Sequence, residues 1–277
     1  MAVFTHFKKV SLLTCVAVTA FVGFAGLAQA ALIVDRGLPD QNLNNAAGAD
    51  RSNVAWAFNG EFLAGDDFSL GAVAPGNRSW RIDRISVWQI GGNPTLGDKF
   101  DSISLFLGRD DGSSVDKVST ANLAGNATDN GDVTVSQVTY PGTGTTYQGS
   151  SGTFLNMWQV DFDNLGLYDP GSYLFAMGGE GPDDPLTFNH ASNAALSGTP
   201  QQGADNRYRW FSGTGANASI TPGGFIDSNG NGWDKSSDIN IQVFAQQVPE
   251  PFTLSLFGAG LLAMGAAGRR RKAGSAS

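Results

Sequence analysis

Hydrophobic and polar residues alternate with a period of two through much of the chain between residues 31 and 248. In the segment DSISLFLG, three apolar side chains share one face, and Ser102 and Ser104 occupy the other. This period is that of a β-strand with one face in a core, so the pattern predicts half-buried antiparallel strands. The apolar faces of four such strands are Ile103, Leu105 and Leu107; Trp158, Val160 and Phe162; Tyr173, Phe175 and Met177; and Ile239, Ile241, Val243 and Ala245.

A longer segment, RIDRISVWQI at residues 81–90, departs from this alternation once. Its apolar positions change face between Ile82 and Ile85. One extra residue in a strand has this effect, so we predict a β-bulge near Asp83 or Arg84.

Clusters of Gly, Pro, Asn and Asp separate the strand-like segments, as in GGNP at 91–94, GRDDGSS at 108–114 and EGPDDP at 180–185. Short strands between such turns, without helical periodicity, are typical of a β-sandwich or a β-barrel. We predict a single all-β domain at residues 31–247, an antiparallel β-sandwich of the jelly-roll-like kind. Residues 35–50 lack a pattern and predict a loop.

Residues 1–30 have the layout of a signal peptide for the Sec translocon. Two lysines precede an apolar run at residues 10–27, and Ala28 and Ala30 form an A-x-A site for signal peptidase. These small residues favour cleavage after Ala30 over an uncleaved anchor. The only cysteine, Cys15, lies in this segment, so we predict that the exported domain has neither a disulfide nor a cysteine nucleophile.

The predicted domain is acidic. Residues 31–248 carry 11 Lys and Arg residues against 24 Asp and Glu residues, a formal net charge of −13. This charge opposes binding to nucleic acid and to anionic lipid headgroups. His190 is the only histidine after the signal peptide, which excludes a metal site built from several histidines. We expect His190 in a loop or at a strand edge rather than as a general base.

A three-part segment occupies residues 248–272. It opens with Pro249, Glu250 and Pro251, and two prolines so close together predict an extended, accessible peptide outside helix and strand ladder. The uncharged stretch at 252–268 would form a single apolar helix of about 25 Å, short of a hydrocarbon core of about 30 Å. A basic cluster follows and should stay cytoplasmic; it consists of Arg269, Arg270, Arg271 and Lys272.

This order of motif, apolar stretch and arginines resembles the PEP-CTERM sorting signal of exported proteins in Gram-negative bacteria that make extracellular polysaccharide. The resemblance implies that exosortase, an integral membrane enzyme, recognises the segment and cuts it at or near the Pro-Glu-Pro motif. It implies a transient stay in the inner membrane with the domain in the periplasm, then delivery to the cell surface or extracellular matrix. Residues 273–277 form a short tail beyond the signal.

The domain also resembles the choice-of-anchor β-sandwich domains that accompany such sorting signals. The similar segments are ISVW at 85–88, PGSYLF at 170–175, and the closing Gly232-Trp233 with INIQVF at 239–244. Domains of this kind mostly have no assigned activity, so the resemblance implies a fold and a cellular location.

One constellation has the spacing of a calcium-binding loop. Counted from Asp227, oxygen ligands fall at positions one, three, five and twelve, with glycine at six. The predicted calcium ligands are Asp227, Asn229, Asn231 and Asp238. An Asn/Gly turn that leads into the last strand needs the same residues, so a turn is the alternative interpretation.

Tryptophans supply a second candidate site. Trp210 and Trp233 could form an exposed platform that stacks on a sugar ring, whereas Trp88 and Trp158 lie in strands and are expected in the core. Adjacent acidic pairs such as Asp183 and Asp184 fit solvated turns better than the paired acids of a glycosidase.

We therefore expect an exported protein without catalysis of its own and without a required cofactor, a structural or adhesive component associated with exopolysaccharide. The alternative is a carbohydrate-binding module, with its dependence on calcium left open, and the third hypothesis is a polysaccharide-active enzyme. The expected partners are the Sec translocon, signal peptidase, exosortase and extracellular polysaccharide.

Overall fold

The computed structural model describes residues 30–38, 52–57, 62–92, 95–125, 128, 131–138, 147–148, 154–181, 187–192, 203, 205, 207–226 and 238–250. The predicted signal peptide up to residue 29, and the predicted apolar helix and basic cluster after residue 250, lie outside these ranges. Within these ranges no helix has the length and the apolar character that a membrane crossing requires.

The chain forms β-strands and one short 3₁₀ helix, η1, whose Thr95 and Asp98 build a capping box. The elements are β1 (Ala31–Arg36), β2 (Ser52–Ala57), β3 (Phe62–Leu70), β4 (Asn77–Gly91), η1 (Leu96–Asp98), β5 (Ser102–Arg109), β6 (Val115–Asn122), β7 (Val133–Gln137), β8 (Tyr147–Gln148), β9 (Phe154–Tyr168), β10 (Gly171–Glu180), β11 (Thr187–Ser192), β12 (Tyr208–Ser212), β13 (Ser219–Ile226), β14 (Asp238–Ile239) and β15 (Ile241–Pro249).

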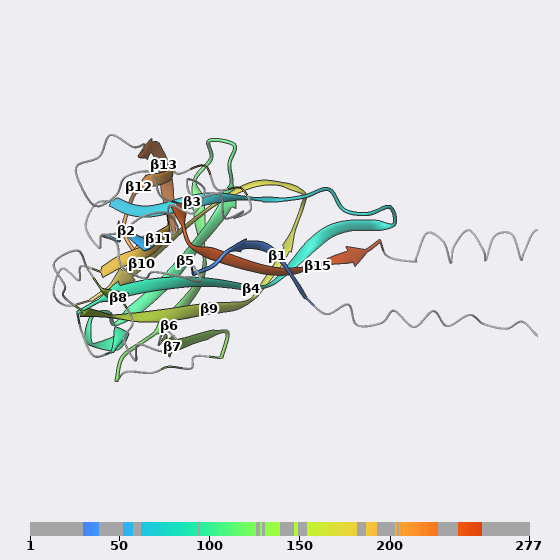
Figure 1. Cartoon of the computed structure of the whole chain (residues 1–277). Helices are drawn as coiled ribbons and strands as arrows, with labels where there is room; N and C mark the ends of the chain where they lie inside the picture. The colour runs from blue at the N-terminus through green and yellow to red at the C-terminus, as the bar shows by residue number, and fades with distance from the viewer. Residues whose placement is uncertain are drawn as a thin grey trace, which may run out of the picture.

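The strands build two antiparallel sheets, which confirms the all-β prediction and is consistent with a β-sandwich (Figure 1). In the first sheet β4 is central, with β9 on one side and with β15 and β11 along the other. β1 continues this sheet beyond β15, and β7 continues it beyond β9. The second sheet closes into a ring in the order β10, β3, β12, β13, β6, β5.

Two apolar clusters contain side chains of the ring strands, and a third, formed by Trp88, Ile90 and Met157, belongs to the first sheet. The larger cluster draws buried side chains from both sheets and fills the space between them. The smaller cluster draws on all six strands of the ring, with Leu63, Phe106, Val115, Leu174, Ala176, Phe211 and Ile220. The ring strands therefore bury apolar side chains on two faces.

The expected half-buried character is wrong for β5 and β10. The predicted faces of these strands do lie in the large cluster. The opposite face of β5 contributes Phe106 to the small cluster, and Ser104 on that face is buried and hydrogen bonds Thr120 at 2.8 Å. The opposite face of β10 contributes Leu174 and Ala176. Closure of the ring covers a face that an open sheet would leave to solvent.

Other expectations about the strands are confirmed. The apolar faces predicted for β9 and β15 lie in the large cluster, and Trp88 and Trp158 are buried. Against β15, Arg84 pairs with Phe244 and Ile82 with the next residue, Ala245, so Asp83 is the extra residue of β4, as the predicted bulge requires. The loop expected from residue 35 is wrong at its start, because Asp35 and Arg36 belong to β1.

Candidate functional site

The last strand of the domain runs into the predicted sorting motif without a linker. In β15, Val248 pairs with Ser79 of β4, and Pro249 lies opposite Asn77 after a register shift. The amide of Glu250 then donates a hydrogen bond of 2.8 Å to the carbonyl of Gly76. Pro249 and Glu250 are exposed. The prediction that the Pro-Glu-Pro motif lies outside any strand is thus wrong for Pro249, which ends β15. A proline can occupy this position because no N–H is needed there.

Side chains tie the end of β15 to the domain. Oε1 of Gln247 accepts hydrogen bonds from the backbone amide of Ala74 at 2.9 Å and from Nδ2 of Asn77 at 2.8 Å. Nε2 of Gln246 donates to Oδ2 of Asp83, the bulge residue, at 2.8 Å. The turn before β4 and the bulge within β4 therefore both contact the residues that precede the Pro-Glu-Pro motif.

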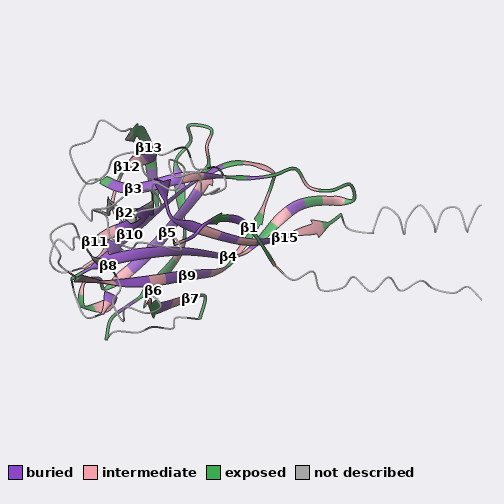
Figure 2. Ribbon diagram, in the orientation of Figure 1, coloured by how far each residue is buried: buried purple, intermediate pink, exposed green. Residues whose placement is uncertain are grey.

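β15 has two parts with different surroundings, which we call the inner segment (residues 241–245) and the outer segment (residues 246–249). The inner segment lies between β1 and β4, and this pairing ends where Ala31 faces Ala245. Among the residues that the structure describes, the outer segment pairs with β4 alone. Figure 2 shows β4 and β15 passing from buried to partly exposed toward this end, which extends beyond the body of the domain.

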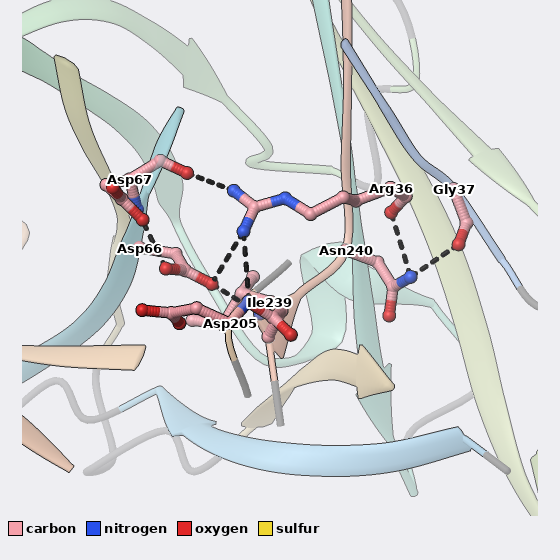
Figure 3. A network of polar contacts seen from close by, with 8 residues as sticks. Arg36, Gly37, Asp66, Asp67, Asp205, Ile239 and Asn240 are labelled. Carbon is pink, nitrogen blue, oxygen red and sulfur yellow. Dashed lines mark hydrogen bonds and ion pairs between the residues drawn. The ribbon is translucent and has the colours of Figure 1, made fainter. Parts of the chain in front are cut away.

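A buried cation joins three strands in the interior (Figure 3). Nη1 of Arg36, the last residue of β1, lies 3.4 Å from Oδ2 of Asp66 in β3 and 3.3 Å from Oδ1 of Asp238 in β14. Nη2 of Arg36 donates to the carbonyl of Asp67. The amide of Ile239 donates to Oδ2 of Asp66 at 2.7 Å. These contacts join the first strand of the domain to the residues that introduce its last strand.

Burial shifts the pKa values of acidic groups in and beside this cluster. Desolvation raises the pKa of the Asp66 carboxyl well above its usual value, Arg36 opposes the rise, and Asp238 adds to it. The pKa of Asp205 is raised as well, by burial first and then by the charge of Asp67. The side chains of Asp66 and Asp238 serve to hold strands together, since both are inaccessible to solvent.

Further hydrogen bonds connect this cluster to His190 through Asn240. Nδ2 of Asn240 donates to the carbonyl of Arg36 at 2.8 Å and to that of Gly37. Its Oδ1 lies 2.8 Å from Nδ1 of His190 and accepts the imidazole proton. The expected loop or edge position of His190 is wrong, because it lies in β11 beside β2 and is fully buried. Burial lowers its pKa to about 4, so the imidazole is neutral.

The predicted calcium site has one ligand among the described residues. Asp227, Asn229 and Asn231 lie outside the described ranges, whereas Asp238 is buried in the Arg36 cluster. Besides Arg36, Oδ1 of Asp238 accepts the amide of Asp205 at 2.8 Å. Calcium binding at this loop stays a prediction.

An apolar groove of about 430 Å³ crosses β3, β12 and β13, and we call it the Trp210 groove. The ring centroids of Phe62 and Trp210 lie 6.4 Å apart at 75°, an edge-to-face pair. The groove is lined by Phe62, Trp210, Ser212, Gly223 and Gly224. A Cβ on Gly224 would meet nothing within 4 Å, so this glycine keeps the groove wide. Trp233, predicted to join Trp210, lies outside the described ranges.

Two cations contact an aromatic ring in the strands that carry the groove residues. Phe225 follows the groove glycines and is 40 % exposed. The guanidinium of Arg209 lies 4.0 Å from the centre of its ring, and that of Arg207 lies 5.9 Å away. Nη1 of Arg209 also pairs with Oδ1 of Asp110 at 3.0 Å. The groove itself thus offers two aromatic side chains and one hydroxyl, which suit a ligand with both apolar and hydroxyl surfaces.

The sequence alone did not single out Arg36, Asn77 or Gln247. For Arg36 a signal existed, because Val34 and Arg36 continue the alternation of β1 onto its buried face. Asn77 and Gln247 have no local signal, since 170 positions separate these two partners.

The comparisons with known proteins concern the end of β15 and the residues after it. The family of the PEP-CTERM protein-sorting motif matches residues 247–272, which begin at Gln247 of the outer segment. No curated protein and no solved structure matches the chain. The match confirms the predicted sorting signal. The chain therefore carries a PEP-CTERM protein-sorting motif at residues 247–272, which indicates an exported protein that is sorted by exosortase.

Proposed function

We propose that the exported domain is a structural or adhesive component of the cell surface or extracellular matrix, associated with exopolysaccharide, and that it carries no catalysis of its own. The observation that carries this proposal is the direct continuity of β15 with the sorting motif. A strand that is anchored in the core and ends at the motif delivers the domain in a fixed orientation, as display on a surface requires.

The charge and the interior of the domain support this role. A net charge of −13 over residues 31–248 keeps the exported domains apart from one another and from anionic lipid. The groups with the strongest pKa shifts, Asp66 and His190, lie in the interior, where they brace strands. In the absence of cysteine after Cys15, such buried contacts take over part of the role that disulfides have in other exported domains.

A deletion in the producing bacterium tests the structural role. Residues 38–240 are removed from the chromosomal copy, and both predicted signals are kept. Cohesion of the surface-attached population and retention of polysaccharide are then measured against the wild type and a complemented strain. We expect both quantities to fall and to recover on complementation. Unchanged cohesion and retention would contradict the proposal.

The Trp210 groove supports a second candidate, carbohydrate binding by the domain. A partly exposed tryptophan beside Phe62 can stack on the apolar face of a sugar ring, and Ser212 can hydrogen bond its hydroxyls. The groove has a volume of about 430 Å³, and Gly224 adds no side chain to it.

Binding of the domain to polysaccharide from the producing strain tests this candidate. Trp210→Ala should abolish retention on immobilised polysaccharide. Trp80→Ala is the matched control, since Trp80 is also partly buried and packs against the same core cluster. Equal retention by both variants would contradict binding at the groove. The same binding assay in the presence of a chelator tests whether binding requires calcium. Release of new reducing ends from the polysaccharide would favour the third hypothesis, a polysaccharide-active enzyme.

A further inference from the structure

The sorting motif begins inside the folded domain. Residues 247–249 belong both to the matched motif and to β15, where they pair with β4. An enzyme that binds an extended peptide in a groove uses the backbone N–H and C=O groups of that peptide. In the folded domain, the groups of the outer segment that face β4 already take part in the sheet. Binding by exosortase and pairing with β4 therefore require the same backbone groups of residues 247–249.

We propose that exosortase acts on the outer segment of β15 only after this segment has separated from β4, and that the turn at residues 74–77 controls the separation. Exosortase thus meets a strand end that alternates between a form paired with β4 and a separated form. The hydrogen bonds of Asn77 and Ala74 to Gln247 stabilise the paired form. The folded domain regulates access to its own sorting signal.

The contacts of the outer segment are few enough for such opening. The side chains of residues 246–248 are only partly buried, and Pro249 and Glu250 are exposed. Strand ends with little buried apolar surface and solvent-accessible hydrogen bonds open locally without global unfolding. Separation of this segment therefore leaves the apolar clusters intact, since none of them includes a residue of 246–249.

The inner segment sets a limit to the separation. Ala245 is fully buried and lies between Ala31 of β1 and Ile82 of β4. The pairing with β4 shifts register between Phe244 and Ala245, at the bulge. Opening beyond this point would break the pairing with β1 and expose the large cluster. The exposed peptide thus begins at Gln246, directly before the matched motif.

A disulfide across the outer segment tests the proposal. Ser79 and Val248 are direct pairing partners, so Ser79→Cys with Val248→Cys can link β4 to β15. The only native cysteine is Cys15 in the predicted signal peptide, so no other thiol of the exported domain competes. The full chain is produced in cells with exosortase, and the cleaved fraction is followed by mass. We expect loss of cleavage in the oxidised double variant and recovery with a membrane-permeant reductant.

Control variants distinguish two causes of lost cleavage: the linkage of β15 to β4, and the change of a residue that exosortase recognises. Each single cysteine variant should be cleaved as in the wild type. A second disulfide, Leu32→Cys with Phe244→Cys, links the inner segment to β1 and should leave cleavage unchanged, because this part stays paired. Wild-type cleavage of the oxidised Ser79 and Val248 pair would overturn the proposal, as would failure of reduction to restore cleavage.

A variant that weakens the attachment of the outer segment to β4 should have the opposite effect on cleavage. Asn77→Ala removes one hydrogen bond to Gln247 and lies outside the matched motif. Loss of one such bond should raise the cleavage rate roughly threefold to tenfold where opening limits it. Asn122→Ala is the matched control, because Oδ1 of Asn122 accepts a turn hydrogen bond from Ala124, far from β15. Equal rates in the wild type and Asn77→Ala would contradict the proposal.

Hydrogen exchange supplies a readout that is independent of exosortase. In the exported domain that retains residues 246–250, the amides that donate toward β4, such as that of Glu250 to Gly76, should exchange faster than those of Ile241 and Val243. Asn77→Ala should speed the outer amides and leave the inner amides unchanged. Equal protection along the whole of β15 would overturn the proposal, whatever the cleavage assays show.

Discussion

The guanidinium of Arg36 lies 3.4 Å from the carboxylate of Asp66, and both side chains are inaccessible to solvent. Asp238 lies against the same guanidinium at 3.3 Å. A buried charge is tolerated where a partner compensates it, so this contact ties the start of the domain to the residues that lead into its last strand.

Replacement of Arg36 should destabilise the domain strongly. Arg36→Met leaves the two buried carboxylates without their cation, and such a loss costs about 3–5 kcal/mol. The measurement is guanidinium unfolding followed by tryptophan fluorescence. Arg81→Met is the control, because Arg81 is 51 % exposed in its pair with Asp83 and should change stability by no more than about 0.5 kcal/mol. A similar small effect at Arg36 would contradict the role assigned to the cluster.

Stability should fall as the pH decreases from about 6.5 to about 4, in part through His190. Its folded pKa of about 4 lies below its ordinary value of 6.5, so the unfolded state binds more protons in this window. The free energy of unfolding should drop by about 3 kcal/mol across it. At pH above 6.5 this contribution is complete.

The comparison of wild type with His190→Gln isolates this effect. The raised pKa of Asp66 acts with the opposite sign, because stability falls as the pH rises through its window, and it is shared by both proteins. We expect the difference in unfolding free energy between the two proteins to shrink toward pH 4. A difference that stays constant between pH 7 and pH 4 would show that His190 does not titrate as described.

Gly65 should tolerate no side chain. A Cβ at this position would lie 2.0 Å from the carbonyl oxygen of Phe175 in the neighbouring strand β10, and backbone cannot yield as a flexible side chain does. Gly65→Ala should therefore lower stability by about 1–3 kcal/mol or more. Gly71→Ala meets nothing within 4 Å and serves as control. Thermal unfolding of both variants measures the difference, and equal melting temperatures would refute the close approach.

Processing should remove the end of the chain. In cells with exosortase we expect the exported protein to lose everything after about Pro251, since the matched motif spans residues 247–272. Intact-mass measurement of the exported protein checks this, and a strain without exosortase is the control. Residues 252–277 retained in the presence of the enzyme would contradict the expected cut.

Period-two alternation predicted the apolar faces of β9 and β15 and the bulge at Asp83, because each depends on neighbours along the chain. The alternation gave a wrong prediction for Phe106. Its face of β5 was expected to be polar because it carries Ser104, but this face is buried when β6 and β13 close the ring. Burial of this kind depends on strand pairing between distant segments, which local alternation does not encode.

The functional residues divide in the same way. The sorting motif was predictable, since its three parts are contiguous and physically distinct. Trp210 was predictable as a candidate because of its residue type, but the groove around it combines Phe62 with Ser212, Gly223 and Gly224. The charge compensation of Arg36 required Asp66 and Asp238 from two other strands, so the sequence offered only its place on the buried face of β1.

The pairing of Ala31 with Ala245 has a consequence for the order of events during export. A chain that crosses the membrane from its N-terminus delivers β1 first and β15 last, so β1 waits for its partner until almost the whole domain has passed. A chain cut short before Ile241 would leave open edges on β1 and β4, a template for aggregation. The same truncation removes the sorting signal, so a defective chain can neither complete its sheet nor be addressed to the surface.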